Sequence, residues 1–136
     1  MSLDFLLDKA KNENFIIPKN VLLIEYAPQI EILERASLFI THAGMNSTSE
    51  AIHYGVPVIC TPVKADQPLC AIRLADNLKL GINLDTENFT SKELYDSINK
   101  VLSDESFQER IVSFARISRK YDGTKNAADI VQECLA

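Results

Sequence analysis

The fold is set by one decapeptide, Thr41-His42-Ala43-Gly44-Met45-Asn46-Ser47-Thr48-Ser49-Glu50. An apolar run over residues 37–40 precedes it and predicts a buried strand. Residues 51–54 continue with helical spacing until Gly55 ends the pattern. The decapeptide therefore predicts a strand, a tight turn and a helix that begins near Asn46. Junctions of this kind are common in α/β domains, and most of them bind nothing.

The start of this helix is a candidate site for an anion. The first N–H groups of a helix have no intrahelical partner and carry the positive end of its dipole, so a phosphate there gains several hydrogen bonds. His42, Asn46 and Ser47 are expected beside the same point. Gly44 is expected to matter because a side chain would block the close approach of an oxyanion and hinder a turn with positive φ.

Composition and charge limit the number of domains and the classes of partner that the chain can have. The chain has 136 residues, 46% hydrophobic and 24% charged, which suits one globular domain. Its 19 acidic and 14 basic residues give a net charge of −5, so a nucleic acid partner is not expected. No apolar run approaches the roughly 20 residues that span a bilayer, and the N-terminus does not open a signal peptide. We therefore expect a cytoplasmic protein without a membrane span.

The cysteines point to neither a disulfide framework nor a metal site. Cys60, Cys70 and Cys134 are odd in number, far apart and without the spacing of metal ligands. We therefore expect reduced and mostly packed thiols.

Alternating strands and helices predict an α/β fold with an open, mainly parallel sheet and helices on both faces. Strands are expected at residues 21–24, 38–40, within 55–62 and, as an edge, at 82–84. Helices are expected at residues 29–35, from Asn46 to 54, from 66 or 67 to about 79 with Gly81 as its cap, at 90–102, at 104–120 and from 124 onward. Residues 4–11 suit either a short helix or a strand.

Ligands of an open parallel sheet gather outside the carboxyl ends of its strands, and three segments follow predicted strands there. The first carries an aromatic ring at Tyr26 and an amide at Gln29, and the second is the turn before Asn46. The third carries Asp66 and Gln67. This order suits the base, the diphosphate and the sugar of a nucleotide sugar.

Glu50 completes the predicted nucleoside site, because it lies on the helix face of Asn46 and Ser47 and can accept hydrogen bonds from ribose hydroxyls. Structural alternatives remain for several of these residues. His42 could be a core histidine, Tyr26 could simply pack, and Glu50 could be a solvated acid. Asp66 and Gln67 could serve only as a helix cap.

Ordered matches between residues 26 and 67 give the chain a family resemblance. It resembles the UDP-glycosyltransferase superfamily, most of all the bacterial macrolide-type glycosyltransferases. The resemblance is carried by Tyr26-Ala-Pro-Gln29, Leu33, Phe39-Ile-Thr-His42-Ala-Gly44-Met-Asn46-Ser47-Thr-Ser-Glu50, Gly55-Val-Pro57, Pro62 and Asp66-Gln67. The family often has tryptophan where Tyr26 stands.

The resemblance implies a GT-B fold, in which two Rossmann-like domains face each other and the C-terminal one binds the donor. It implies transfer of a hexose from a UDP-sugar, with inversion, to a hydroxyl of a small lipophilic acceptor. No cofactor and no metal are expected, because His42, Ser47 and the helix dipole would stabilise the departing diphosphate. Residues 1–136 are expected to be a single donor-binding domain, a fragment without the acceptor domain and without the first strand and helix of the donor domain.

The family's general-base histidine belongs to the acceptor domain, so no catalytic residue is expected in this chain, and the chain alone is expected to be inactive. Two other interpretations stay open. The chain could be the donor-binding subunit of a two-chain glycosyltransferase, or a non-catalytic nucleotide-binding relative. A homodimer is also conceivable, because an incomplete sheet invites self-association.

Overall fold

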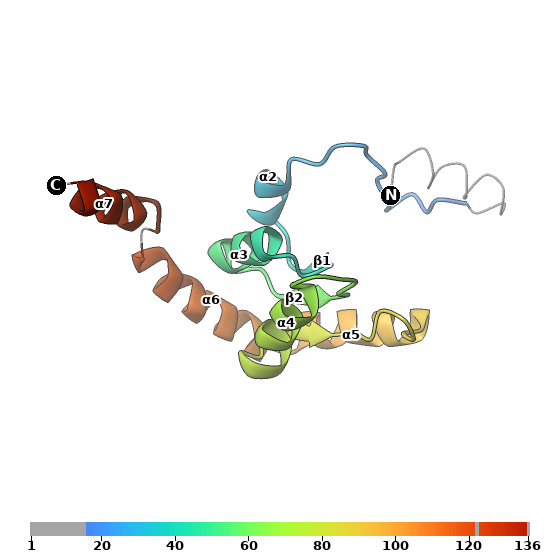
Figure 1. Ribbon diagram of the computed structural model, residues 1–136. Helices are drawn as coiled ribbons and strands as arrows, with labels where there is room; N and C mark the ends of the chain where they lie inside the picture. Colours follow the sequence, from blue (N-terminus) through green and yellow to red (C-terminus); the bar gives the residue numbers. More distant parts are fainter. Residues whose placement is uncertain (1–15, 122, 136) are drawn as a thin grey trace. The chain divides into compact units, whose positions relative to one another are not determined.

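The computed structural model describes residues 16–121 and 123–135 (Figure 1). The chain divides into two compact units, Met1–Ile32 and Leu33–Ala136. The segment expected at residues 4–11 lies outside the described residues. The elements are α2 (Gln29–Leu33), β1 (Phe39–Thr41), α3 (Met45–Tyr54), β2 (Val58–Cys60), α4 (Gln67–Ala71), the π-helix η1 (Ile72–Asn77), β3 (Gly81–Asn83), α5 (Ser91–Ser103), α6 (Glu105–Lys120) and α7 (Gly123–Leu135).

The second unit contains a parallel sheet with the strand order β1-β2-β3. Ile59 of the central strand β2 pairs with Ile40 of β1 and with Ile82 of β3. All three residues of β2 are buried. A strand covered on both faces has no solvent side, which explains why its sequence is continuously apolar instead of alternating. The predicted α/β fold with a parallel sheet is confirmed.

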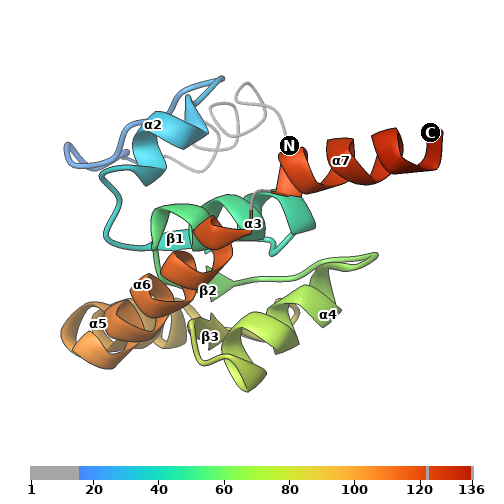
Figure 2. The same cartoon turned by 90° about the vertical axis from the view of Figure 1, so that its left-hand side faces the viewer.

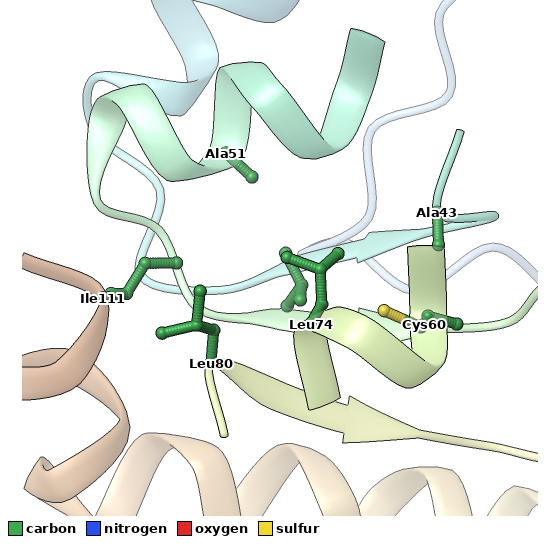
Figure 3. Packing of buried hydrophobic residues seen from close by; sticks show 8 residues of the cluster. Ala43, Ala51, Cys60, Leu74, Leu80 and Ile111 are labelled. Atoms are coloured by element: carbon green, nitrogen blue, oxygen red, sulfur yellow. The ribbon is translucent and has the colours of Figure 1, made fainter. Parts of the chain in front are cut away.

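Successive residues of β2 face two separate hydrophobic clusters. Val58 and Cys60 pack on one face of the sheet with residues of α3, α4, η1 and α6, whereas Ile59 packs on the other face with residues of α5 and α6. Figure 2 shows α4 and α5 on opposite sides of the strands. In Figure 3, the side chains of Leu80 and Ile111 point toward one another on the side of the sheet that α3 covers. Helices therefore cover both faces, as the sequence predicts.

The three cysteines are free thiols, and two of them pack in or against the core. Cys60 lies in the core, where burial, reinforced by the charges of Asp76 and Cys70, raises its pKa to about 12. Its thiol is therefore protonated and behaves as a small apolar group. Cys70 is half-buried and packs against the core cluster that contains Cys60, whereas Cys134 is exposed. The expectation of mostly packed thiols therefore holds for two of the three cysteines and is wrong for Cys134.

Local capping signals place the ends of several helices where the sequence predicts them. Gly55 adopts the left-handed region with φ 71° and ends α3. Thr90 begins α5 with a reciprocal capping box, in which its N–H donates to Glu93 Oε2 over 2.7 Å and its Oγ1 accepts from the Glu93 N–H over 3.2 Å. The Thr90 N–H that binds the Glu93 carboxylate lowers the pKa of that group. Asp104 caps α6 by accepting the Ser106 N–H over 3.0 Å.

Helix α6 holds the carboxyl ends of two other helical segments. Arg119 donates to the His53 carbonyl in the last turn of α3, with 2.7 Å between Nε and O. Arg110 Nε donates to the Lys79 carbonyl beyond η1 over 2.8 Å. Cations at helix C-termini are favourable because they donate hydrogen bonds to the last carbonyls and interact favourably with the negative end of the helix dipole.

Among the described residues, no helix has the combination of length and hydropathy that a membrane span requires.

The strand expected at residues 21–24 is not formed. Val21, Leu22 and Ile24 are exposed, and the Val21 N–H donates to the Pro18 carbonyl over 3.0 Å, closing a turn. An apolar run becomes a strand only where another strand accepts its backbone hydrogen bonds. Among the described residues of the first unit, helix α2 is the only element that begins, so residues 21–24 have no partner strand in that unit.

The predicted role of Gly81 is also wrong. The long helix expected from residue 66 or 67 forms as α4 followed by η1, but Lys79, with φ 55°, takes the left-handed position after it. Gly81 is instead the first residue of β3, opposite Val58. A Cβ atom at Gly81 would lie 1.9 Å from the Val58 carbonyl oxygen, so only glycine allows β3 to approach β2.

We predict that Gly81→Ala destabilises the chain by about 2 kcal/mol or more, because the clash involves backbone atoms that cannot move without separating the two strands. Urea unfolding followed by circular dichroism measures the change. Gly123→Ala is the matched control, since a Cβ atom there meets nothing within 4 Å. Equal midpoints for both variants would contradict the close approach of β3 to β2.

Candidate functional site

The chain passes from β1 to α3 through a turn with an unusual backbone. Ala43 is fully buried and adopts φ 63°, the left-handed region that residues other than glycine rarely occupy. Gly44, the N-cap of α3, has φ −66° and ψ 149°, which any residue can adopt. The expectation that Gly44 supports a positive φ is therefore wrong, because the turn places that strain on the preceding alanine.

The missing side chain of Gly44 leaves space for the ring of His42. A Cβ atom at this position would lie 2.5 Å from His42 Nε2 and 3.2 Å from His42 Cδ2. The imidazole therefore occupies the space that a side chain at residue 44 would take. His42 is exposed, which excludes the alternative of a core histidine.

The first turn of α3 begins without a side-chain cap. The Gly44 carbonyl accepts the Thr48 N–H over 3.0 Å, which closes the first turn of the helix. Glycine has no side chain with which to cap the preceding N–H groups. Helix geometry directs these N–H groups out of the N-terminus, where they add to the positive end of the dipole.

A pocket of about 420 Å³ lies at this N-terminus. It joins residues of the turn and of the first turn of α3 with one residue from the loop after β2. Its lining residues are His42, Gly44, Met45, Asn46, Ser47 and Asp66. The structure thus brings together all four residues expected at the diphosphate and one of the two expected at the sugar.

Glu50 lies one helical turn beyond Asn46 on α3 and is half-buried.

The sequence analysis assigned no role to Met45, which lines the pocket. Its position at the start of α3 could have indicated that Met45 lies at the site. It was missed because the helix was expected to begin one residue later, at Asn46.

Asp66 reaches the pocket from the N-terminus of α4. It follows Ala65, whose φ of 58° turns the loop, and it occupies the N-cap position of α4. Its side chain makes no capping hydrogen bond, and the thiol of Cys70 lies 3.9 Å from Asp66 Oδ2. Asp66 therefore occupies the position of a helix cap, but its carboxylate does not cap the helix.

Gln67 does not line the pocket. Its Oε1 accepts the Val63 N–H over 2.9 Å and the Lys64 N–H over 3.0 Å. These two bonds close the loop between β2 and α4. A carboxamide has an oxygen that accepts and an NH2 group that donates, so the donor end of Gln67 is the part left for a ligand.

Tyr26 and Gln29 belong to the first unit. Tyr26 is 84% exposed, so it does not pack within the described residues of that unit. Gln29 is the first residue of α2. Their expected place beside a nucleoside base remains a prediction.

Charge distinguishes this pocket from a larger one nearby. In the pocket at α3, the imidazole of His42 and the polar groups of Asn46 and Ser47 accompany the positive end of the helix dipole. A pocket of about 580 Å³ at the carboxyl end of β3 is lined instead by Asp76, Asp85 and Glu87 among others. Like charges repel, so three carboxylates disfavour an anion in the larger pocket, whereas the pocket at α3 contains one carboxylate, that of Asp66. Among residues 16–121 and 123–135, no three His, Cys, Asp or Glu side chains are grouped to hold a metal ion.

Comparison with known proteins identifies the family. The family model described as "UDP-glucoronosyl and UDP-glucosyl transferase" matches residues 7–122. The chain is 34% identical over 119 residues to the uncharacterized UDP-glucosyltransferase YojK of Bacillus subtilis, covering 88% of this chain and 29% of that protein. It is 38% identical over 112 residues to the NDP-glycosyltransferase YjiC of Bacillus subtilis, covering 82% of this chain and 28% of that protein.

Solved structures agree with this assignment. The glycosyltransferase of kitacinnamycin superimposes with a TM-score of 0.80 at 31% identity, over 87% of this chain and 30% of that one. The glycosyltransferase VinC, solved in complex with DTDP, superimposes with a TM-score of 0.81 over 91% of this chain and 31% of that one, and at 21% identity it supports the GT-B fold alone. The chain spans less than a third of the length of the curated relatives named above. The motif in residues 41–50 and the parallel sheet that positions it agree with these matches. We conclude that the chain belongs to the UDP-glucoronosyl and UDP-glucosyl transferase family.

Proposed function

We propose that this chain binds the UDP-sugar of an inverting glycosyltransferase that transfers a hexose to a hydroxyl of a small lipophilic acceptor. The observation that carries the proposal is the pocket at the N-terminus of α3, where His42, Asn46 and Ser47 meet the positive end of the helix dipole. Membership of the family supports a nucleotide sugar as the ligand.

The diphosphate binds at the amino end of α3 in this proposal. Backbone N–H groups of the first turn donate to phosphate oxygens, and the side chains of Asn46 and Ser47 add donors. The absence of a side chain at Gly44 leaves room both for the His42 ring and for the phosphates. The imidazole of His42 donates to the same anion.

The sugar lies on the Asp66 side of the pocket. A carboxylate repels phosphate and accepts hydrogen bonds from hydroxyl groups, so Asp66 favours the hexose over the diphosphate. Gln67 contributes its NH2 group, because its oxygen is already bonded to the loop. Glu50 accepts from the ribose hydroxyls, and Tyr26 and Gln29 contact the base.

In the reaction, the acceptor oxygen forms a bond to the anomeric carbon as the bond from that carbon to the diphosphate oxygen breaks. The electron pair leaves with UDP, and the acceptor proton passes to a base that we assign to no residue of this chain. Helix α3, His42 and Ser47 stabilise the negative charge that develops on the diphosphate. These groups supply the positive field without a metal ion.

Calorimetry with UDP tests the proposal directly. We expect Ser47→Asp to weaken UDP binding at least tenfold, because it places a like charge beside the phosphates. Ser49→Asp is the matched control, since it adds the same charge two residues later on α3, at a position that does not line this pocket. A wild-type chain that does not bind UDP, or equal affinities in the two variants, would refute the proposed site.

Gly44→Ala tests the role of the empty space beside His42. We expect the fold to survive, since the backbone at residue 44 suits any residue, while the new methyl group displaces the imidazole. UDP affinity should fall about tenfold, with a change in the NMR signals of the His42 ring. Unmoved ring signals together with wild-type affinity would contradict this role, and Gly123→Ala should match the wild type in both measurements.

A pair of substitutions at Gln67 separates its structural and ligand-binding ends. Gln67→Glu keeps the oxygen that accepts from Val63 and Lys64, so amide exchange of these residues should stay close to wild type. Gln67→Ala removes that oxygen and should accelerate both exchange rates. If both variants bind a UDP-hexose more weakly than the wild type but bind UDP equally well, the NH2 group contacts the sugar. Unchanged UDP-hexose affinity in Gln67→Glu would exclude that contact.

A further inference from the structure

The left-handed conformation of Ala43 needs a local cause. A residue with a Cβ atom is disfavoured in this region, and such conformations persist only where neighbouring contacts enforce them. Ala43 has no exposed surface and packs in the same core cluster as Val58 and Cys60. Its N–H is therefore also removed from water and requires a partner within the protein.

Thr41 provides that partner. Its Oγ1 accepts the Ala43 N–H over 3.3 Å, a bond between residues i and i+2 that bends the chain into a turn. Thr41 is only 6% exposed, so water does not compete for this bond.

The backbone of Thr41 is itself held in the sheet. Its carbonyl accepts the Thr61 N–H over 2.8 Å, and Thr41 lies opposite Cys60 in the register of β1 and β2. The hydroxyl that binds the Ala43 N–H therefore has a fixed position relative to β2.

His42 lies between these two fixed residues. With Thr41 anchored in the sheet and Ala43 anchored in the core, the backbone of His42 has little freedom, and its ring lies beside Gly44, where His42 lines the pocket. The direction of the ring and the start of α3 both follow from the turn that the Thr41 hydroxyl closes.

From this geometry we infer that Thr41 is a positioning residue of the phosphate site: its buried hydroxyl holds the 42–44 turn in the shape that aims His42 and the N-terminus of α3 at the ligand. The ligand part of this inference rests on the proposed UDP-sugar function. Thr41 acts through Ala43 and does not line the pocket.

The test compares Thr41→Val, which keeps the shape but loses the acceptor, with Thr41→Ser, which keeps the acceptor. In Thr41→Val, we expect faster amide exchange at Ala43, displaced NMR signals of the Gly44 amide and the His42 ring, and about tenfold weaker UDP binding. Thr41→Ser should restore all of these to near wild-type values.

Thr48→Val serves as a control for general loosening, because Thr48 is equally buried but its hydroxyl donates within α3, to the Met45 carbonyl. The Gly44 and His42 signals of this control should remain closer to wild type than those of Thr41→Val. Unmoved Gly44 and His42 signals in folded Thr41→Val, or equal displacement in Thr48→Val, would overturn the inference. These NMR measurements need no ligand. A wild-type chain that fails to bind UDP would therefore refute the proposed function, while the NMR signals would still test whether Thr41 holds the turn.

Discussion

The structure depends on the short connection between a buried strand and a helix that packs on the same sheet. Strand β1 ends at Thr41, paired with Cys60, and α3 begins at Met45. Three residues must therefore reverse the chain, and a turn this tight places Ala43 in the left-handed region. The amino end of α3 consequently lies at the carboxyl edge of the sheet, where α/β proteins bind their ligands. At the other end of α3, Arg119 binds the His53 carbonyl, so both ends of the helix are held.

Elements defined by local signals were predictable from the sequence. The glycine after α3, the Thr90 capping box and the cap at Asp104 act within one helical turn, and each lies where the pattern predicts. The apolar run of β2 was equally informative, since it reports burial on both faces. Where the outcome depends on residues far away in the chain, prediction failed. Residues 21–24 are apolar enough for a strand, but a strand exists only beside a partner.

Two glycines show why a sequence pattern alone does not reveal the structural role of a residue. The sequence indicated that Gly44 and Gly81 were important, but the positive φ expected at Gly44 and the helix cap expected at Gly81 were both wrong. Gly44 leaves space for the ring of His42, and Gly81 allows β3 to lie against the Val58 carbonyl. Such contacts involve a particular neighbour in three dimensions, and a pattern along the chain does not contain that neighbour. The candidate site was predictable in part, because the sequence pointed to every residue that lines the pocket except Met45. The bonds of Gln67 to its own loop and of Thr41 to Ala43 required coordinates.

The most direct test of the central claim is a crystal structure of this chain with UDP. We expect the diphosphate within hydrogen-bonding distance of the first-turn N–H groups of α3, beside His42 and Ser47, with the left-handed turn at Ala43 retained. A diphosphate bound elsewhere on the sheet, or side chains filling the pocket at α3 while UDP binds at another surface, would contradict the role assigned to this helix.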